Sequence, residues 1–167
     1  ENREKMMLVV KAVLEKWIGK YTELNLEFSH DINCHHNYAA EEEHYGKTVW
    51  VHRKGAVRAE NGELAVIPGA MGSYSYVVMG KGNPESFCSS SHGAGRCYSR
   101  KGAMDAFTCE QVIRDLAAQG VVLGKKKKAD VAEESRFAYK DIEQVMNNQT
   151  DLVAPVKRLK TVGVVKG

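Results

Sequence analysis

The sequence lacks several features that mark whole classes of protein. No apolar run among its 167 residues approaches the roughly 20 residues that a membrane-spanning helix needs. Residues 1–5 are charged or polar, so they do not resemble a secretory signal peptide, which has an apolar central region. No initiator methionine stands at their start, and we therefore expect a chain that begins inside a longer gene product or was trimmed.

Paired cysteines and a strong net charge are absent as well. The four cysteines form no Cys-x-x-Cys pair, which argues against a zinc ribbon and suits a reducing compartment, so we expect a cytoplasmic protein. The 24 basic and 21 acidic side chains leave a net charge of +3, too small to indicate a nucleic-acid partner by itself. With 43% apolar and 27% charged residues, the composition is that of a globular protein large enough for one core.

The hydrophobic pattern predicts one α+β domain over residues 1–167, with short mixed strands and helices on the outside. Apolar residues recur at helical spacing over residues 2–20, and alternation over residues 24–28 favours a strand. The four lysines of residues 125–128 are interpreted as a solvated loop. Further strands are expected at residues 48–53, 56–59, 63–67, 73–79 and 162–165, and further helices at residues 108–119, capped by Thr108, and 139–147.

The densest polar cluster covers residues 30–37 and continues with three glutamates and His44. Imidazole is a common metal ligand, and a neighbouring amide or carboxylate can orient it. Because successive side chains of an extended segment point in opposite directions, His35 and His36 cannot easily bind one ion together. Two interpretations stay open: one of the two histidines is a metal ligand, or both are hydrogen-bonded loop residues. For an isolated His-His pair the second interpretation is favoured.

A second polar segment surrounds His92. Three serines precede it, and residues 93–96, Gly-Ala-Gly-Arg, follow it. Successive backbone N–H groups of such a segment can converge on a phosphate, and hydroxyls and a guanidinium add donors. An imidazole beside that cradle can act as a base or as a nucleophile on phosphorus. A Ser/Gly loop with a hydrogen-bonded histidine explains the same residues, and a Cys88–His92 thiol nucleophile lacks a third, orienting group.

Glycine is concentrated in one part of the chain. Ten of the 15 glycines lie between residues 46 and 102, where the backbone is expected to turn sharply or to approach a ligand closely. Inside that window, residues 67–72, Ile-Pro-Gly-Ala-Met-Gly, follow a predicted strand. They can form one wall of a ligand pocket, although ordinary turn chemistry explains them equally well.

Seven stretches combine these motifs in one order along nearly the whole chain. They are His35–Ala39, Val49–Ala56, Ile67–Gly72, Gly82–Cys88, Ser91–Arg96, Ala138–Ile142 and Val165–Gly167. In this order they resemble the RtcB family of RNA-splicing ligases. The resemblance implies the C-terminal portion of the RtcB-type fold, with the family's upstream, metal-binding half absent.

The same resemblance implies an activity. The family joins RNA ends that carry a 3′-phosphate or 2′,3′-cyclic phosphate to 5′-hydroxyl ends, in tRNA splicing and RNA repair, with GTP and Mn²⁺. By resemblance His92 attacks the α-phosphorus of GTP and forms a histidine–GMP intermediate. RNA is the implied partner, and archease is an activating protein that serves this family.

Site residues carry over position by position. His36 resembles a manganese ligand that also contacts the nucleotide, and Asn37 resembles its neighbouring nucleotide contact. The other implied nucleotide contacts are Pro68, Gly69, Ala70, Met71, Ser75, Gly93, Ala94, Gly95, Tyr139 and Lys166. The implied RNA or phosphate contacts are Arg53, Lys54 and Arg96.

Some positions depart from the family pattern. Ser90 stands where the family usually has cysteine, Ala70 where it often has serine, and Cys97-Tyr98 replaces a more apolar pair. The larger departure concerns the metal site. The family's Asp-x-x-Cys metal site, its Asn-His segment and a further metal-binding histidine all belong to the part of the family sequence that precedes the segment resembled here. Of the family's metal ligands only His36 remains, and one imidazole does not hold a catalytic metal site.

We therefore expect a ligase portion that needs its N-terminal half or a partner chain, and that tends to associate through apolar surface. One alternative is a non-catalytic guanylate- or RNA-binding module that kept the pocket without the metal site. A further alternative, independent of the resemblance, is a small phosphate hydrolase based on histidine or cysteine.

Overall fold

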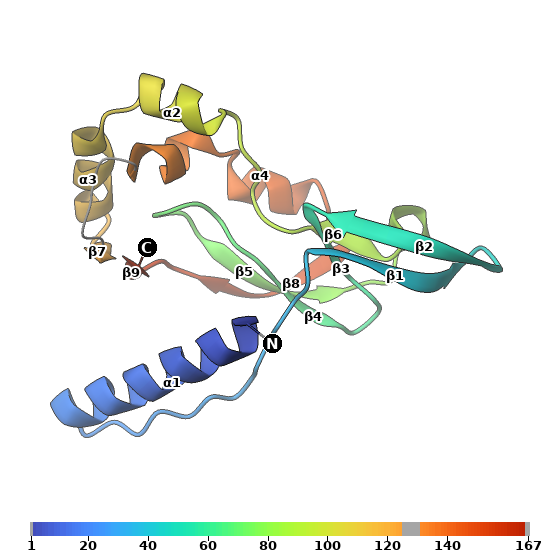
Figure 1. Cartoon of the computed structure of the whole chain (residues 1–167), viewed down its shortest axis with the longest axis horizontal. Coiled ribbons are helices and arrows are strands. Elements are labelled where there is room, and N and C mark those ends of the chain that lie inside the picture. The colour runs from blue at the N-terminus through green and yellow to red at the C-terminus, as the bar shows by residue number, and fades with distance from the viewer. Residues whose placement is uncertain (1, 125–130, 166–167) are drawn as a thin grey trace. The chain divides into compact units, whose positions relative to one another are not determined.

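The computed structural model describes residues 2–124 and 131–165, and helices and short strands both occur along them (Figure 1). The predicted α+β class is confirmed. The chain separates into two compact units, Glu1–Asn33 and Cys34–Gly167, so the predicted single domain over residues 1–167 stays a prediction. The predicted lysine loop at 125–128 and the predicted contact Lys166 lie outside the described residues. Within the described residues, no helix has the length and apolar character that crossing a membrane requires.

The first unit is built from one helix, α1 (Asn2–Tyr21), and the extended segment that follows it. The predicted helix over residues 2–20 is confirmed, and Thr22 closes its last turn by donating from its hydroxyl to the Ile18 carbonyl over 2.9 Å. The predicted strand at 24–28 is wrong, because residues 22–36 adopt no regular structure. Alternation specifies a strand only where another strand pairs with it, and no described strand does so here.

The second unit holds several small sheets among its described residues (Figure 1). Each predicted strand beyond residue 34 is found within two residues of its expected start. The antiparallel sheets are β1 (Asn37–His44) with β2 (Lys47–Lys54), β3 (Ala56–Arg58) with β6 (Ser89–Ser91), and β4 (Leu64–Ile67) with β5 (Ser75–Gly80) and β8 (Val153–Leu159). The parallel pair is β7 (Val122–Gly124) with β9 (Gly163–Val165).

The α-helices of the second unit begin at side-chain caps. Thr108 and Gln111 form a reciprocal capping box at the start of α3 (Cys109–Ala118), which confirms the predicted cap. The helix expected over 139–147 is shorter than predicted, because Asp141 caps it and it runs as α4 (Ile142–Asn147). The remaining helical elements are α2 (Arg100–Ala106), η1 (Pro84–Ser86), η2 (Val131–Glu134) and η3 (Arg136–Ala138).

Two apolar clusters hold these elements together. One gathers side chains of β3, β4, β5, β8 and α4, and its fully enclosed members include Ile67 and Val78. The other packs α3 against η2 and the loop before β5, with Leu116, Val131 and Met71 at its centre. The loop between β4 and β5 therefore joins both clusters, since Ile67 belongs to the first and Met71 to the second.

A buried arginine fastens the β1–β2 hairpin to the loop that precedes β6. Arg53 is only 2% exposed, and its guanidinium forms a bidentate ion pair with the Glu42 carboxylate. The same guanidinium donates to the Phe87 carbonyl over 2.8 Å, to Ser89 Oγ over 3.0 Å and to the Tyr38 hydroxyl over 3.2 Å. Arg53 therefore ties two segments 34 residues apart in sequence.

The segment that Arg53 binds has an unusual backbone. Phe87 and Cys88 both have positive φ angles, 53° and 49°, a conformation that costs non-glycine residues of the order of 1 kcal/mol each. On the hairpin side, His44 Nε2 lies 3.0 Å from Glu42 Oε2. The hydrogen bonds from Arg53 lower the pKa of Glu42 to about 2, so this carboxylate stays charged down to strongly acidic pH.

Replacing Glu42 by Gln leaves the Arg53 charge buried without a charged partner. We expect Glu42→Gln to lower the free energy of unfolding by about 3 kcal/mol, because a buried charge is costly once its counter-charge is gone. Urea denaturation at neutral pH measures this. Glu63→Gln is the matched control, since Glu63 pairs with the exposed Arg58 and should cost less than about 1 kcal/mol. Equal losses in the two variants would contradict the role given to Glu42.

The depressed pKa of Glu42 also predicts how stability depends on pH. The pKa is about 2 in the folded chain and about 4.5 in the absence of structure, so folding favours the ionised form. The stabilisation is complete above about pH 4.5 and is lost as the pH falls towards about 2. Urea denaturation across this range should show a shallower acid loss in Glu42→Gln than in the parent. Parallel profiles would contradict the expectation.

Candidate nucleotide site

The structure brings the two principal predicted histidines together. His92 directly follows β6, and its backbone N–H donates to the Gly55 carbonyl, between β2 and β3, over 3.4 Å. His36 directly precedes β1, and its ring stacks on the ring of His92 with centroids 5.3 Å apart. The neighbouring His35 instead contacts the Tyr38 ring edge-on, at 5.8 Å. The two adjacent histidines thus face different rings, as their expected opposite directions require.

The surroundings of His92 lower its pKa. Burial is the largest cause, the charge of His36 adds to it, and the interaction of the ring with the Gly55 backbone opposes it. A lowered imidazole pKa leaves the ring neutral at neutral pH, with a lone pair on one nitrogen. Such a ring can accept a proton or attack an electrophilic phosphorus.

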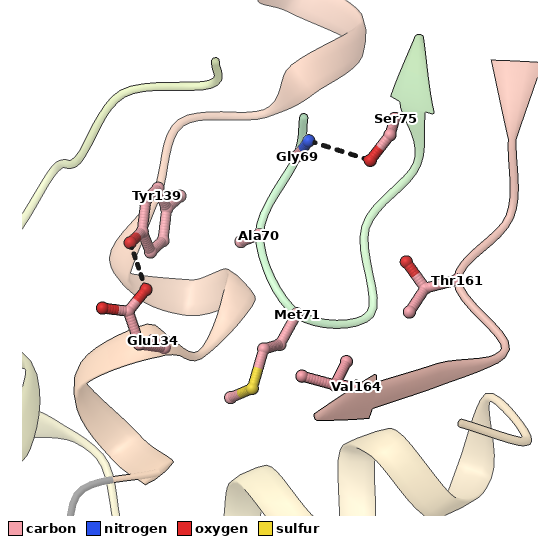
Figure 2. Close-up of a pocket in the computed structure, with 8 residues that line it drawn as sticks. All are labelled: Gly69, Ala70, Met71, Ser75, Glu134, Tyr139, Thr161 and Val164. Atoms are coloured by element: carbon pink, nitrogen blue, oxygen red, sulfur yellow. Dashed lines mark hydrogen bonds between the residues drawn. The ribbon is translucent and has the colours of Figure 1, made fainter. Parts of the chain in front are cut away.

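A cavity of about 310 Å³ lies beside the loop between β4 and β5 (Figure 2). Its size is at the lower end of the range for small-molecule pockets. Five of its lining residues were predicted nucleotide contacts: Gly69, Ala70, Met71, Ser75 and Tyr139. Three others were not predicted, because no motif marks them: Glu134, Thr161 and Val164.

The loop at the pocket depends on a glycine. The Gly69 N–H donates to Ser75 Oγ over 3.3 Å, a contact drawn in Figure 2. A Cβ on residue 69 would lie 2.1 Å from the Tyr74 carbonyl oxygen, closer than any packed atoms approach. Thr161 holds the far side of the loop by donating from its hydroxyl to the Ser73 carbonyl over 2.8 Å. The wall of the pocket is therefore fixed by close backbone packing at Gly69 and by hydrogen bonds between the loop backbone and the Ser75 and Thr161 hydroxyls.

A hydrogen bond connects this loop to the segment after His92. The Ala94 N–H donates to the Pro68 carbonyl over 3.1 Å, and a Cβ on Gly93 would meet the same oxygen at 3.1 Å. The Gly95 carbonyl accepts from the Lys140 N–H over 2.9 Å, next to Tyr139. The predicted cradle, residues 93–95, is thus hydrogen-bonded to two segments next to the pocket lining but does not itself line the pocket, and the Ala94 N–H is used within the protein.

Tyr139 is held by charged neighbours on both sides. Its hydroxyl donates to Glu134 Oε2 over 2.5 Å and accepts from Arg96 Nη1 over 2.9 Å, and the Arg96 guanidinium lies over its ring at 4.8 Å. Burial and the Glu134 hydrogen bond raise the pKa of Tyr139, so the phenol stays protonated. Figure 2 shows Tyr139 and Glu134 on one side of the pocket.

The other predicted nucleotide and RNA contacts differ in whether their side chains are exposed to a ligand. Asn37 and Lys54 are exposed and pair across the hairpin, beside His36. Arg53 is buried, and Arg96 also donates to the Tyr98 and Glu133 carbonyls, so both guanidinium groups are bound inside the protein. The predicted RNA contacts of these two arginines stay predictions without support from their geometry.

The described residues bear on the predicted metal site. Across residues 2–124 and 131–165, no three His, Cys, Asp or Glu side chains are grouped so that they could hold an ion. The described residues therefore do not fit a complete manganese site. His36 as a manganese ligand stays a prediction.

Gly69→Ala tests the backbone wall of the pocket. Its methyl group would overlap the Tyr74 carbonyl, so the loop must move, and we expect a loss of about 1–3 kcal/mol in the free energy of unfolding. Gly163→Ala is the control, because the nearest atom would lie at an ordinary 3.6 Å. Thermal or urea unfolding measures both. A Gly69→Ala variant as stable as Gly163→Ala would show that the loop is not so constrained.

The chain as a whole is similar to known proteins. The family model described as "tRNA-splicing ligase RtcB" matches residues 1–167. The RNA-splicing ligase RtcB of Escherichia coli (strain K12) is 44% identical over 170 residues, which cover 99% of this chain and 40% of the relative. The tRNA-splicing ligase RtcB of Pyrobaculum aerophilum is 32% identical over 189 residues, 99% of this chain and 39% of the relative.

The chain thus spans about 40% of the length of these curated relatives. The family match covers every part of the chain, including the residues that bring His36, His92 and the pocket loop together. The chain belongs to the RtcB family of tRNA-splicing ligases.

Proposed function

We propose that this chain is the nucleotide-transferring portion of an RNA ligase, dependent on GTP and Mn²⁺, that joins 3′-phosphate or 2′,3′-cyclic phosphate ends to 5′-hydroxyl ends. One observation carries the proposal. The segment that begins at His92 is hydrogen-bonded, through the Ala94 N–H and the Pro68 carbonyl, to the loop of a pocket that five predicted guanylate contacts line.

The proposed reaction assigns His92 the role of nucleophile. One of its imidazole nitrogens attacks the α-phosphorus of GTP, a P–N bond forms and pyrophosphate leaves. The guanylate then passes to the RNA 3′-phosphate, and the 5′-hydroxyl of the second RNA displaces GMP. A cyclic phosphate end is first opened by hydrolysis. The lowered pKa of His92 supports the first step, since a neutral ring carries the lone pair that attacks.

The pocket residues supply binding in this proposal. Tyr139, fixed between Arg96 and Glu134, offers a ring face to a base, and Ser75 and the backbone of residues 69–71 offer polar contacts. Asn37 and the exposed Lys54 lie beside His36 and are proposed to contact the nucleotide and RNA phosphate respectively. Lys166 is retained as a proposed nucleotide contact from the family pattern alone.

Manganese and the partners belong to the proposal through the family. His36 is the proposed ligand on this chain, and the other ligands are proposed to come from an N-terminal half or partner chain. The apolar side chains of α1 support such a partner, because Leu8 and Val9 are more than half exposed and no residue described in this helix is buried. RNA, a cytoplasmic location and assistance by archease complete the proposal.

A second candidate is a guanylate- or RNA-binding module without catalysis. The observation that favours it is the absence of a three-ligand metal cluster from the described part of the chain. Such a module would bind guanine nucleotides in the same pocket without needing Mn²⁺.

Transfer of guanylate to His92 tests the proposal. The chain is mixed with the N-terminal remainder of the Escherichia coli relative, GTP radiolabelled at the α-phosphate and Mn²⁺. We expect label on the parent chain, in a bond that acid cleaves and alkali spares, and none on His92→Ala. His35→Ala is the matched control and should be labelled like the parent, because His35 contacts Tyr38 rather than His92.

The outcomes separate the two candidates. Label that persists in His92→Ala, or that is absent with and without the N-terminal remainder, would overturn the ligase proposal. If no label is found with or without the N-terminal remainder, saturable GMP binding in equilibrium dialysis without Mn²⁺ would favour the binding module.

A further inference from the structure

Apart from Asn37 and Lys54 at its end, the outward face of the β1–β2 hairpin takes no part in the site described above. Every second side chain of the two strands points away from the Arg53–Glu42 pair, and all eight on this outer face are exposed. These residues are Asn37, Ala39, Glu41, Glu43, Thr48, Trp50, His52 and Lys54.

Trp50 is the unusual member of this face. Its side chain is 71% exposed, although tryptophan is the side chain with most apolar area to gain from burial. Its neighbours on the face are polar, with Glu41 directly opposite and Thr48 and His52 on either side along β2. The core of a protein interface is depleted of charged residues, so a lone aromatic ring with a carboxylate opposite does not suit one. A single flat ring among polar groups suits a nucleobase, which stacks on it and keeps its polar edges in water.

Trp50 is the first of three side chains that form a row along β2. Trp50, His52 and Lys54 follow one another at every second residue, so they form a row about 13 Å long on one face of β2. Lys54 ends the row opposite Asn37, which follows His36. Gly55 comes next, and its carbonyl binds the His92 backbone. The row therefore leads from the exposed ring to the stacked histidines.

The charges along the face limit what can lie on it. Lys54 offers a cation at the end near His92, and His52 offers a ring N–H in the middle. Towards the hairpin turn, Glu41 and Glu43 oppose any further phosphate. A ligand on this row thus has one or two phosphates near Lys54 and an unpaired base about two nucleotides further on.

We propose that Trp50, His52 and Lys54 form a ledge for the single-stranded end of the RNA substrate, with a base stacked on Trp50 and the backbone phosphate beside Lys54. This inference rests on the proposed function for the identity of the substrate. The proposal adds a requirement on the substrate: the RNA end that reacts at His92 must carry a few unpaired nucleotides. A base inside a duplex is already stacked on both faces and has none to offer to Trp50.

Tryptophan fluorescence tests the contact directly. Trp17→Phe removes the one other tryptophan, so that emission reports Trp50 alone. A short uridine oligonucleotide ending in a 3′-phosphate, added without GTP or Mn²⁺, should quench this emission saturably, whereas a blunt duplex should not. An oligonucleotide that binds without changing the emission, or that does not bind at all, would overturn the proposal.

Substitutions measure the contribution of each residue. In fluorescence anisotropy with the labelled oligonucleotide, Trp50→Ala should weaken binding by about 5- to 100-fold, and Trp50→Phe should restore most of it. Lys54→Ala should weaken binding and reduce the slope of log affinity against log salt by about 1. Trp17→Ala, the matched control at another exposed tryptophan, should bind like the parent.

The remaining outcomes distinguish the ledge from other roles. Parent-like binding by Trp50→Ala, or an equal loss for single-stranded and duplex RNA, would overturn the proposal. Loss of association with the N-terminal half of the relative in Trp50→Ala, with RNA binding intact, would assign the ring to a protein interface instead. His92→Ala should retain Trp50-dependent binding, so a failure of guanylate transfer with quenching intact counts against the proposed function alone.

Discussion

The buried ion pair between Arg53 and Glu42 fixes the position of the segment on which His92 lies. Arg53 reaches from the hairpin to the carbonyl of Phe87, the first of two consecutive residues with positive φ, and to the hydroxyl of Ser89, which follows them. That backbone is unfavourable for non-glycine residues and persists because the arginine holds it. The strand that leaves it, β6, pairs with β3 and delivers His92 beside Gly55 and the His36 ring. A charge buried for structural reasons thus sets the geometry of the proposed nucleophile.

The pocket is attached to this histidine by backbone rather than by side chains. The Ala94 to Pro68 hydrogen bond joins the segment after His92 to the loop that Gly69 allows, and Thr161 anchors the other side of that loop. Tyr139 lines the same pocket because its hydroxyl is hydrogen-bonded to Arg96 and Glu134. The two arginines that the family pattern suggested for RNA, Arg53 and Arg96, therefore build the site, while Lys54, opposite Asn37 in the hairpin, is exposed.

The sequence predicted the parts of the fold that local signals specify. The periodicity of α1, the Thr108 cap and the glycine-bounded strands of the second unit are all found, because propensity and capping act within a few residues. The strand β1 was not predicted, since its inward face carries Tyr38, Glu42 and His44 in place of an apolar row. Their burial depends on Arg53, which alternation of apolar residues does not reveal. The strand expected at 24–28 fails for the opposite reason, as its alternation has no described partner.

For the site, the family pattern found five of the eight pocket residues, while Glu134, Thr161 and Val164 come from segments without a motif. The most direct measurement of the central claim is the binding position of GMP. In a chain with ¹³C-labelled methionine methyl groups, GMP should shift the Met71 resonance, which belongs to the pocket, and leave those of the exposed Met79 and Met104 in place. An unshifted Met71 resonance at saturating GMP, or a shift confined to the exposed methionines, would contradict a guanylate pocket beside His92.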